Sequence, residues 1–460
     1  MTLTLDAIRI CCEGVIPATI ATCSAAGEPN VAYLSQVEYV DPGHVALTFQ
    51  FFNTTRRNVL ENPVARLLLT DPETVARYRL RIRYERTETA GPLFERMKAK
   101  LAGIASHTGM AGVFRLQGAD VYAVEDIESI PGAVLPPPPP RRNLLSAVRT
   151  CAQRLSAIAD LDALLEGTLV ALREQFGIAH ALVLMADTKG NRLYTVASTG
   201  YPDSGVGSEI PFGAGVIGVA AQQRTAIRIG HATSEYAYGR AIREAALHEG
   251  LALETEIPLP GLPASRSQLA VPIEAFGQLI GVLYADSPLD LRFSYDEEDA
   301  LVAVGGQLGT AIHHLHEVER LGREEAQAAA DVPGGKAAAG ASAEPLLVRH
   351  YPENDSVFLG DDYLIKGVAG AILWALLQDH AQGRTRFTNR ELRLDPRIKL
   401  PDLSDNLEAR LILLQKRLVE RDAGLRLEKT GRGQFRLAVS RPLRLANVRG
   451  ELAQRAASQA

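Results

Sequence analysis

A group of hydrogen-bond donors and positive charge follows an apolar segment near the N-terminus. The run HVALTFQFF at 44–52 leads into TTRRN at 54–58, and the segment stops at an Asn-Pro pair. Where a strand ends and a helix begins, free backbone N–H groups and the helix dipole favour an anion. Threonine hydroxyls and an arginine fork have the donor geometry that a phosphate needs. The residues therefore indicate an anion site, with a threonine helix cap beside solvated arginines as the alternative.

A second basic feature lies on a helical segment near the C-terminus. With about 100° per residue, Arg410, Arg417 and Arg421 fall within roughly 20° of one line, and Lys416 and Asn406 flank them. Arginine and asparagine are the side chains suited to guanine and adenine edges in a DNA groove. The alternative is an ordinary solvated face of an amphipathic helix, and two glutamates on the same helix would repel phosphate.

Charge is distributed unevenly along the chain. Residues 346–450 contain 19 Lys and Arg against 13 Asp and Glu, a net charge of +6, whereas the whole chain carries −5, which leaves −11 for the remainder. A basic module attached to an acidic body suits local neutralisation of nucleic-acid phosphates. This distribution favours DNA binding by the C-terminal part.

Length and composition bound the remaining possibilities. A chain of 460 residues with 46% hydrophobic residues can form about three domains. The four cysteines show neither C-x-x-C spacing nor zinc-type Cys/His spacing, and the N-terminus lacks a signal-peptide pattern. No run of 18 apolar residues occurs in the sequence. We therefore expect a soluble cytoplasmic protein with reduced thiols, no metal site and no membrane contact.

Two segments of linker composition divide the chain. Five consecutive prolines lie within 133–142, and prolines form a stiff polyproline II spacer. Residues 321–345 are rich in alanine and glycine and nearly free of large apolar residues. We predict an N-terminal unit at 1–132, a central unit at 143–320 and a C-terminal unit at 346–450. Residues 451–460 are predicted to be a tail.

The N-terminal unit shows many short strand signals. Alternating segments such as RYRLRIRYERTET at 77–89, separated by Gly- and Pro-containing turns, predict antiparallel strands closing into a barrel. With FFNTTRRNVLENPVARLLL at 51–69, this order resembles the FMN-binding split barrels related to pyridoxamine 5'-phosphate oxidase. The resemblance implies that FMN binds, that its phosphate contacts Thr55, Arg56, Arg57 and Asn58, and that the barrel dimerises. Another ligand such as haem remains an alternative.

The oxidase activity itself is not expected. The family's enzyme completes its substrate site with a C-terminal stretch containing Trp, Arg and His, and nothing similar precedes the proline run. No paired acid and base stands out in the barrel either. We therefore expect no catalytic residues here, with a flavin-dependent oxidoreductase as the alternative.

The central unit resembles a GAF domain. Its helical opening is followed by the motifs GAGVIGVAAQQRTAIRI at 213–229 and AVPIEAFGQLIGVLYADS at 270–287, then by FSYDEEDALVAVGGQLGTAI at 293–312. The resemblance implies an α/β sandwich that binds a small molecule and dimerises. The long helical patterns at 144–165 and 297–320 would suit the stalk of a parallel dimer. The ligand is unknown. The implied pocket residues are Tyr236, Tyr238, Arg240, Arg243 and His248.

The C-terminal unit resembles the winged helix-turn-helix domain of OmpR-type response regulators. An apolar helix around Trp374 precedes a helix with a Thr388–Glu391 capping box, then a long third helix and a Gly-rich hairpin. The resemblance implies that the third helix enters the major groove, and a hairpin arginine, Arg432, would meet phosphate or a narrow groove. The predicted DNA-binding residues are Asn406, Arg410, Lys416, Arg417, Arg421 and Arg432.

The predicted architecture is thus a multidomain α+β protein with a split β-barrel, a GAF sandwich and a winged helix. We expect a homodimeric transcription regulator that senses a flavin or another small molecule through the first two units and binds DNA through the third. A flavin-dependent oxidoreductase with a regulatory GAF domain is the second interpretation. A winged helix that contacts protein instead of DNA is the third.

Overall fold

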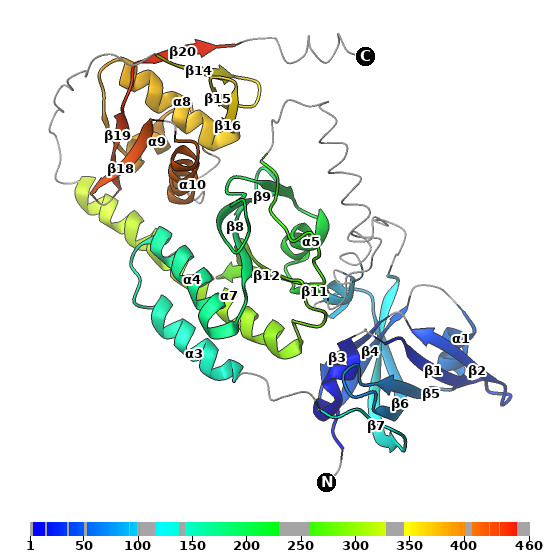
Figure 1. Ribbon diagram of the computed structural model, residues 1–460. Coiled ribbons are helices and arrows are strands. Elements are labelled where there is room, and N and C mark those ends of the chain that lie inside the picture. The colour runs from blue at the N-terminus through cyan, green and yellow to red at the C-terminus, as the bar shows by residue number, and fades with distance from the viewer. Residues whose placement is uncertain are drawn as a thin grey trace.

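The computed structural model consists of three packed units (Figure 1). It describes residues 3–13, 16–34, 36–49, 53–91, 93–98, 101, 116–137, 143–229, 257–327, 345–398, 400, 407–422, 424–431 and 433–448. Much of both predicted linkers and the whole of the predicted tail lie outside these ranges. The predicted GAF pocket residues, Asn406 and Arg432 also lie outside them.

The N-terminal unit is a curled seven-stranded antiparallel sheet, in the order β2-β1-β5-β6-β7-β4-β3. Its long strands β6 and β7 carry bulges that bend the sheet around the buried Ile20, Leu67 and Leu80. The elements are η1 (Asp6–Glu13), β1 (Ala18–Cys23), β2 (Pro29–Leu34), β3 (Val37–Asp41), β4 (His44–Phe49), α1 (Thr54–Glu61), β5 (Val64–Thr70), β6 (Arg77–Glu88) and β7 (Gly118–Ile130).

The central unit is a six-stranded sheet, β10-β9-β8-β13-β12-β11, with helices on both faces. Alternate residues of β8 enter two separate cores, because Val183 packs beneath α4 and α7 whereas Leu182 packs beneath α5. The elements are α3 (Leu144–Leu155), α4 (Leu161–Phe176), β8 (His180–Asp187), β9 (Arg192–Thr199), β10 (Glu209–Pro211), α5 (Gly215–Gln223), β11 (Ile227–Ile229), β12 (Ser267–Ala275), β13 (Gln278–Ser287) and α7 (Tyr295–Gln327).

Two helical predictions for the central unit differ from the structure. The pattern expected to form one long helix from 144 is divided, because Asp160 caps a new helix by accepting a hydrogen bond from the Ala163 amide. Helix α7 continues to Gln327, past the predicted end at 320. Gly309 lets α7 lie directly on β12, since a Cβ there would come within 2.3 Å of the Glu274 carbonyl oxygen.

The described residues of the C-terminal unit form two small sheets around three helices. A four-stranded sheet, in the order β16-β15-β14-β20, combines three strands that come before the helices with one that follows them. A three-stranded sheet, β17-β19-β18, contains the predicted hairpin. The elements are β14 (Leu346–Tyr351), β15 (Ser356–Leu359), β16 (Asp362–Ile365), α8 (Gly367–Ala381), β17 (Arg386–Thr388), α9 (Asn389–Leu394), α10 (Leu407–Glu420), β18 (Leu425–Gly431), β19 (Gln434–Val439) and β20 (Leu443–Asn447).

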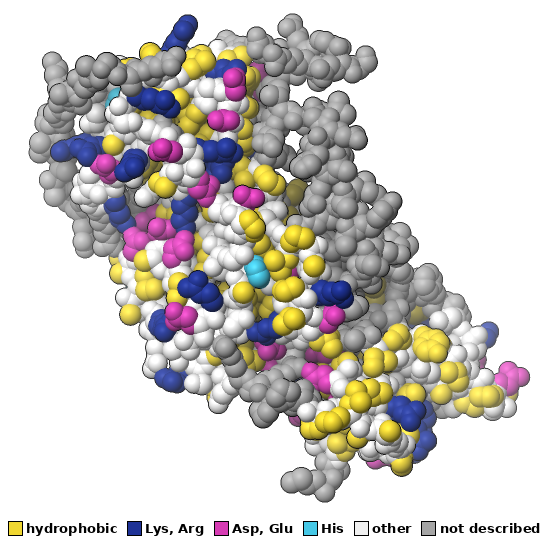
Figure 2. Space-filling model, in the orientation of Figure 1, with side chains coloured by type: hydrophobic (Ala, Val, Ile, Leu, Met, Phe, Trp, Pro, Cys, Tyr) yellow, Lys and Arg dark blue, Asp and Glu magenta, His cyan; other side chains and the backbone are white. Residues whose placement is uncertain are grey.

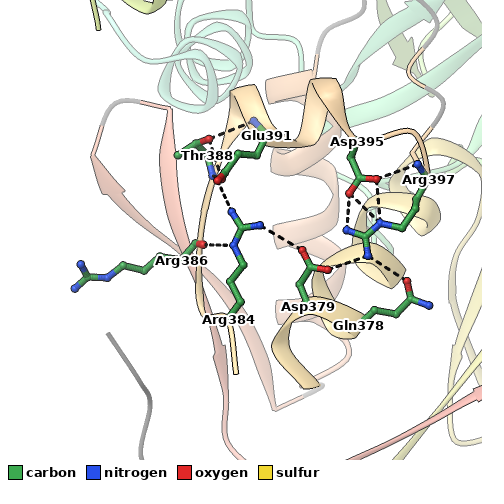
Figure 3. A network of polar contacts seen from close by, with 8 residues as sticks. All are labelled: Gln378, Asp379, Arg384, Arg386, Thr388, Glu391, Asp395 and Arg397. Atoms are coloured by element: carbon green, nitrogen blue, oxygen red, sulfur yellow. Dashed lines mark hydrogen bonds and ion pairs between the residues drawn. The ribbon is translucent and has the colours of Figure 1, made fainter. Parts of the chain in front are cut away.

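A polar network fixes the helices of this unit (Figure 3). The capping box predicted for α9 is confirmed: the Thr388 hydroxyl accepts from the Glu391 amide, and the Glu391 carboxylate accepts from the Thr388 amide. Arg397 donates to Asp395 and, over 2.8 Å, to Asp379 at the end of α8. The network therefore ties α8 to the loop after α9.

Candidate functional site

The predicted phosphate residues surround the start of α1, beside the end of β4. Asn53 caps the helix, since its side chain accepts a hydrogen bond from the Arg56 amide over 3.0 Å. The cap is therefore an asparagine and not one of the threonines. Thr55 accepts from the Asn30 side-chain amide, and its side chain borders a pocket of about 130 Å³.

The four predicted residues do not converge on one point. Thr55 and Arg56 line the pocket. Arg57 is exposed on the outer side of α1, and Asn58 is buried, where its amide donates to the Thr22 hydroxyl over 3.2 Å. Contact with phosphate stays a prediction for all four, and only two of them border the cavity.

The pocket has a mixed lining drawn from β1, β2, β4, α1 and β7. Apolar and aromatic residues are the more numerous in the lining, but polar groups provide about half of the exposed wall. The lining residues are Ile20, Ala32, Tyr33, Leu34, Leu47, Thr48, Phe49, Asn53, Thr55, Arg56, Val59, Asp120 and Tyr122. Such a wall suits a flat ring held by a few polar contacts.

Arg56 is held by groups that the sequence analysis did not identify. Its guanidinium forms an ion pair with Asp120 on β7 and donates to the Thr87 hydroxyl over 2.9 Å. Its Cζ atom lies 4.3 Å from the centre of the Phe49 ring and 5.6 Å from that of Tyr84, within cation–π range. The one sequence signal was an aspartate inside an apolar strand, GADVYAV, since a buried carboxylate needs a partner.

Helix α10 contacts the central unit, which overturns the expectation of an open polar face. Arg410 and Arg417 are only 4% and 6% exposed. The Arg410 guanidinium pairs with Asp187 at 3.1 Å and lies 3.8 Å from the centre of the Tyr194 ring, both in the central unit. Arg417 donates to the Leu364 carbonyl over 3.2 Å and to Glu420 over 2.9 Å. Burial lowers the Arg417 pKa.

Other basic residues of the C-terminal unit also face acidic residues of the central unit. Lys416 pairs with Glu166 at 2.5 Å and with Asp162 at 3.3 Å, and Lys429 pairs with Asp160. Figure 2 shows blue and magenta side chains mixed along the boundary between the two units. Of the predicted DNA-contacting residues that the structure describes, Arg421 alone is exposed. The predicted recognition face is therefore largely covered.

The N-terminal and central units meet through a buried charged cluster. Arg228 on β11 pairs with Glu13 of η1 and, at 2.8 Å, with Glu298 of α7. Its Cζ atom lies 4.4 Å from the centre of the Tyr295 ring, and the Tyr295 hydroxyl donates to the Cys12 carbonyl. Burial raises the Tyr295 pKa well above its usual value. The barrel is thus attached to the central sheet through specific contacts.

Two features are absent from the part of the chain that the structure describes. No group of three or more His, Cys, Asp or Glu residues there is arranged to hold a metal ion. None of its helices combines the length and apolar composition that a bilayer span requires.

Comparisons with solved structures find similarities to separate units. The GAF domain of an Acinetobacter phosphoenolpyruvate-protein phosphotransferase is 23% identical, covering 39% of this chain and 98% of its own, with a TM-score of 0.30. An FMN-binding protein from Syntrophomonas wolfei is 20% identical, covering 27% and 84%, with a TM-score of 0.24. HupZ from Group A Streptococcus is 24% identical, covering 29% and 100%, with a TM-score of 0.23. A search among curated proteins finds no match.

Family models match the first two units. Residues 5–125 match the model for pyridoxamine 5'-phosphate oxidase, and residues 160–312 match the model for the GAF domain. The chain contains an oxidase-like barrel domain and a GAF domain. The pocket beside α1 therefore belongs to the oxidase-like barrel, and the sheet that contacts α10 belongs to the GAF domain. These assignments bear out the resemblances seen in the first two units.

Proposed function

We propose that the protein is a small-molecule-responsive regulator in which the GAF domain connects a ligand-binding barrel to a C-terminal output unit. The observation that carries this proposal is the contact of α10 with the GAF sheet, where Arg410 pairs with Asp187 against Tyr194. The Arg228 cluster connects the barrel to the same domain. A ligand acts on such an arrangement through its different affinity for the closed and released forms.

The proposed barrel ligand is a flavin or a similar flat ring. The family match and the aromatic pocket wall support this choice. The experiment is titration of the purified full-length protein with riboflavin and FMN, followed by flavin fluorescence. Quenching that saturates supports the assignment, whereas an unchanged signal with both flavins rejects it. Turnover with NAD(P)H and an electron acceptor would instead favour the oxidoreductase interpretation.

The proposed output is DNA binding by a winged helix after α10 leaves the GAF domain. The order of three helices followed by a two-stranded hairpin supports this proposal, as does the net charge of +6. The test is gel retardation of duplex DNA at two salt concentrations with the wild type and with Asp187→Asn combined with Glu166→Gln. We expect this double variant, called the released variant below, to bind DNA more tightly than the wild type, because both substitutions weaken the GAF contact.

Control variants distinguish release from a general change of charge. Glu174→Gln combined with Asp126→Asn removes an equal charge from two exposed positions, the first of which faces Arg154, so it should leave retardation unchanged. Arg421→Glu in the released variant should abolish retardation, since this arginine is exposed beside α10. Equal retardation by the wild type and the released variant would contradict covering by the GAF domain.

Contact with protein is the second candidate for the output, because α10 already makes such a contact within the chain. If the released variant does not bind DNA at low salt but the C-terminal unit still binds an added GAF domain, this alternative is preferred.

We also propose that the protein is a homodimer. The exposed apolar residues Val31 and Tyr33 on the edge strand β2 support this proposal. Light scattering of the wild type and Val31→Lys tests it, since the charge should reduce the measured mass.

A further inference from the structure

Arg56 and Asp120 form a paired unit at the polar end of the barrel pocket. Both residues line the cavity, and their side chains are only 13% and 8% exposed. Among the described residues that line it, Arg56 is the one cation and Asp120 the one anion. The pair as a whole is neutral, so the pocket wall offers a phosphate no net positive charge.

The guanidinium is fixed from several directions. Asp120 Oδ1 accepts from Arg56 and from the Thr87 hydroxyl, the latter over 2.6 Å, and Thr87 also receives an Arg56 hydrogen bond. Thr87 lies directly opposite Asp120 in the β6–β7 ladder, and the Tyr84 hydroxyl lies 2.7 Å from the Thr87 hydroxyl. A phosphate that reached Arg56 would approach the Asp120 carboxylate and would have to displace these bonds.

Asp120 also offers a contact of its own. Its Oδ1 atom accepts the two bonds from Arg56 and Thr87, and none of the other described residues donates a hydrogen bond to Oδ2. A carboxylate oxygen in the wall of a pocket accepts hydrogen bonds from ring N–H groups. Arg57, the neighbouring cation on α1, is exposed and does not line the pocket.

We propose that Asp120 determines the specificity of the barrel pocket. It accepts a hydrogen bond from an N–H group of an uncharged planar ring, and its ion pair with Arg56 prevents Arg56 from binding a phosphate. This inference deepens the proposed ligand-binding function and rests on it. It predicts that the affinity for the ligand comes from contacts with its ring and not from contacts with a phosphate group. Riboflavin and FMN should then bind the wild type with dissociation constants within about threefold of each other.

The experiment compares full-length wild type, Asp120→Asn, and Asp120→Asn combined with Arg56→Gln. The double variant removes both charges together, so no buried charge is left alone. Riboflavin and FMN are titrated by fluorescence, and inorganic phosphate is followed by its ³¹P line width. Asp126→Asn, an exposed position on the same strand, is the matched control. Circular dichroism and thermal unfolding verify that each variant is folded.

Asp120→Asn should release Arg56 and strengthen FMN binding over riboflavin by about tenfold or more, as a charge-assisted phosphate contact allows. The ³¹P line of inorganic phosphate should broaden with Asp120→Asn and should not broaden with the double variant. Wild-type broadening with phosphate, or no gain on Asp120→Asn, overturns the inference. If neither flavin binds any variant, the flavin assignment fails, and the phosphate measurement still decides whether Asp120 withholds Arg56.

Discussion

Replacing Arg410 with methionine tests whether the GAF domain stabilises the C-terminal unit through α10. Methionine retains most of the apolar stem and removes the charge, so Asp187 loses its partner while the helix keeps a good helix former. The Asp187 side chain is itself only 12% exposed. We expect a marked loss of stability, because the Asp187 carboxylate keeps its hydrogen bond from the Gly190 amide but loses its cation in a poorly solvated place.

The structure sets the size of the effect. Breaking a buried ion pair from one side costs about 3–5 kcal/mol, and the partial exposure of Asp187 places the expected value near the lower end, about 3 kcal/mol. With a urea m-value between roughly 1.5 and 3 kcal/mol/M, this loss lowers the urea midpoint by about 1–2 M. Combining Arg410→Met with Asp187→Asn should recover part of it, with a coupling energy of about 0.5–3 kcal/mol.

The fluorescence of Trp374 is a specific probe for this measurement. It is the one tryptophan of the chain, and it is buried in the C-terminal unit, where it stacks on His350 with 4.6 Å between ring centres. Arg421→Met is the matched control, because that arginine is exposed at the end of α10. An unchanged midpoint for Arg410→Met, or strictly additive effects in the double variant, would refute the reasoning.

Two further predictions concern the other charged contacts. Arg228→Met should destabilise the chain by about 3–5 kcal/mol in denaturant unfolding, since it leaves Glu13 and Glu298 buried without their cation, and a shift below about 1 kcal/mol would contradict this. The hydrogen bonds from Arg397 lower the pKa of Asp395 in the folded protein. The ionised Asp395 carboxylate therefore stabilises the fold above the unfolded pKa of 3.8, and this stabilisation is lost as the pH falls from 3.8 through the folded pKa. The tryptophan-monitored midpoints of wild type and Asp395→Asn should therefore differ at neutral pH and converge in acid; a constant difference would exclude this linkage.

Local sequence patterns predicted much of the fold. The capping box at Thr388 and Glu391 was predictable because its partners are three residues apart, and the strands of the barrel and the central sheet were indicated by alternation and turns. The break between α3 and α4 was missed, because apolar spacing continues through it. Asp160 was the available signal, since aspartate is a preferred helix cap.

The sites were less predictable, because their decisive partners are distant in the sequence. Asp120 lies 64 residues after Arg56, and Asp187 lies 223 residues before Arg410. Helical spacing placed Arg410 and Arg417 on one side of α10, but spacing alone does not say what covers that side. An arginine beside a phosphate-type motif or on an amphipathic helix therefore needs its carboxylate partner identified before a role can be inferred.

The charge asymmetry of the chain has two physical consequences. The positive charge that would attract DNA phosphates also attracts the acidic GAF domain, and Lys416 and Lys429 face GAF carboxylates. Attachment within one chain gives the internal carboxylates a high effective concentration. If the C-terminal unit binds DNA as proposed, DNA and the GAF domain would compete for the same cations, and a ligand that weakens the GAF contact would raise the affinity for DNA without contacting it. In the proposed regulator, the carboxylates that cover α10 would therefore matter more than the length of the linker before the C-terminal unit.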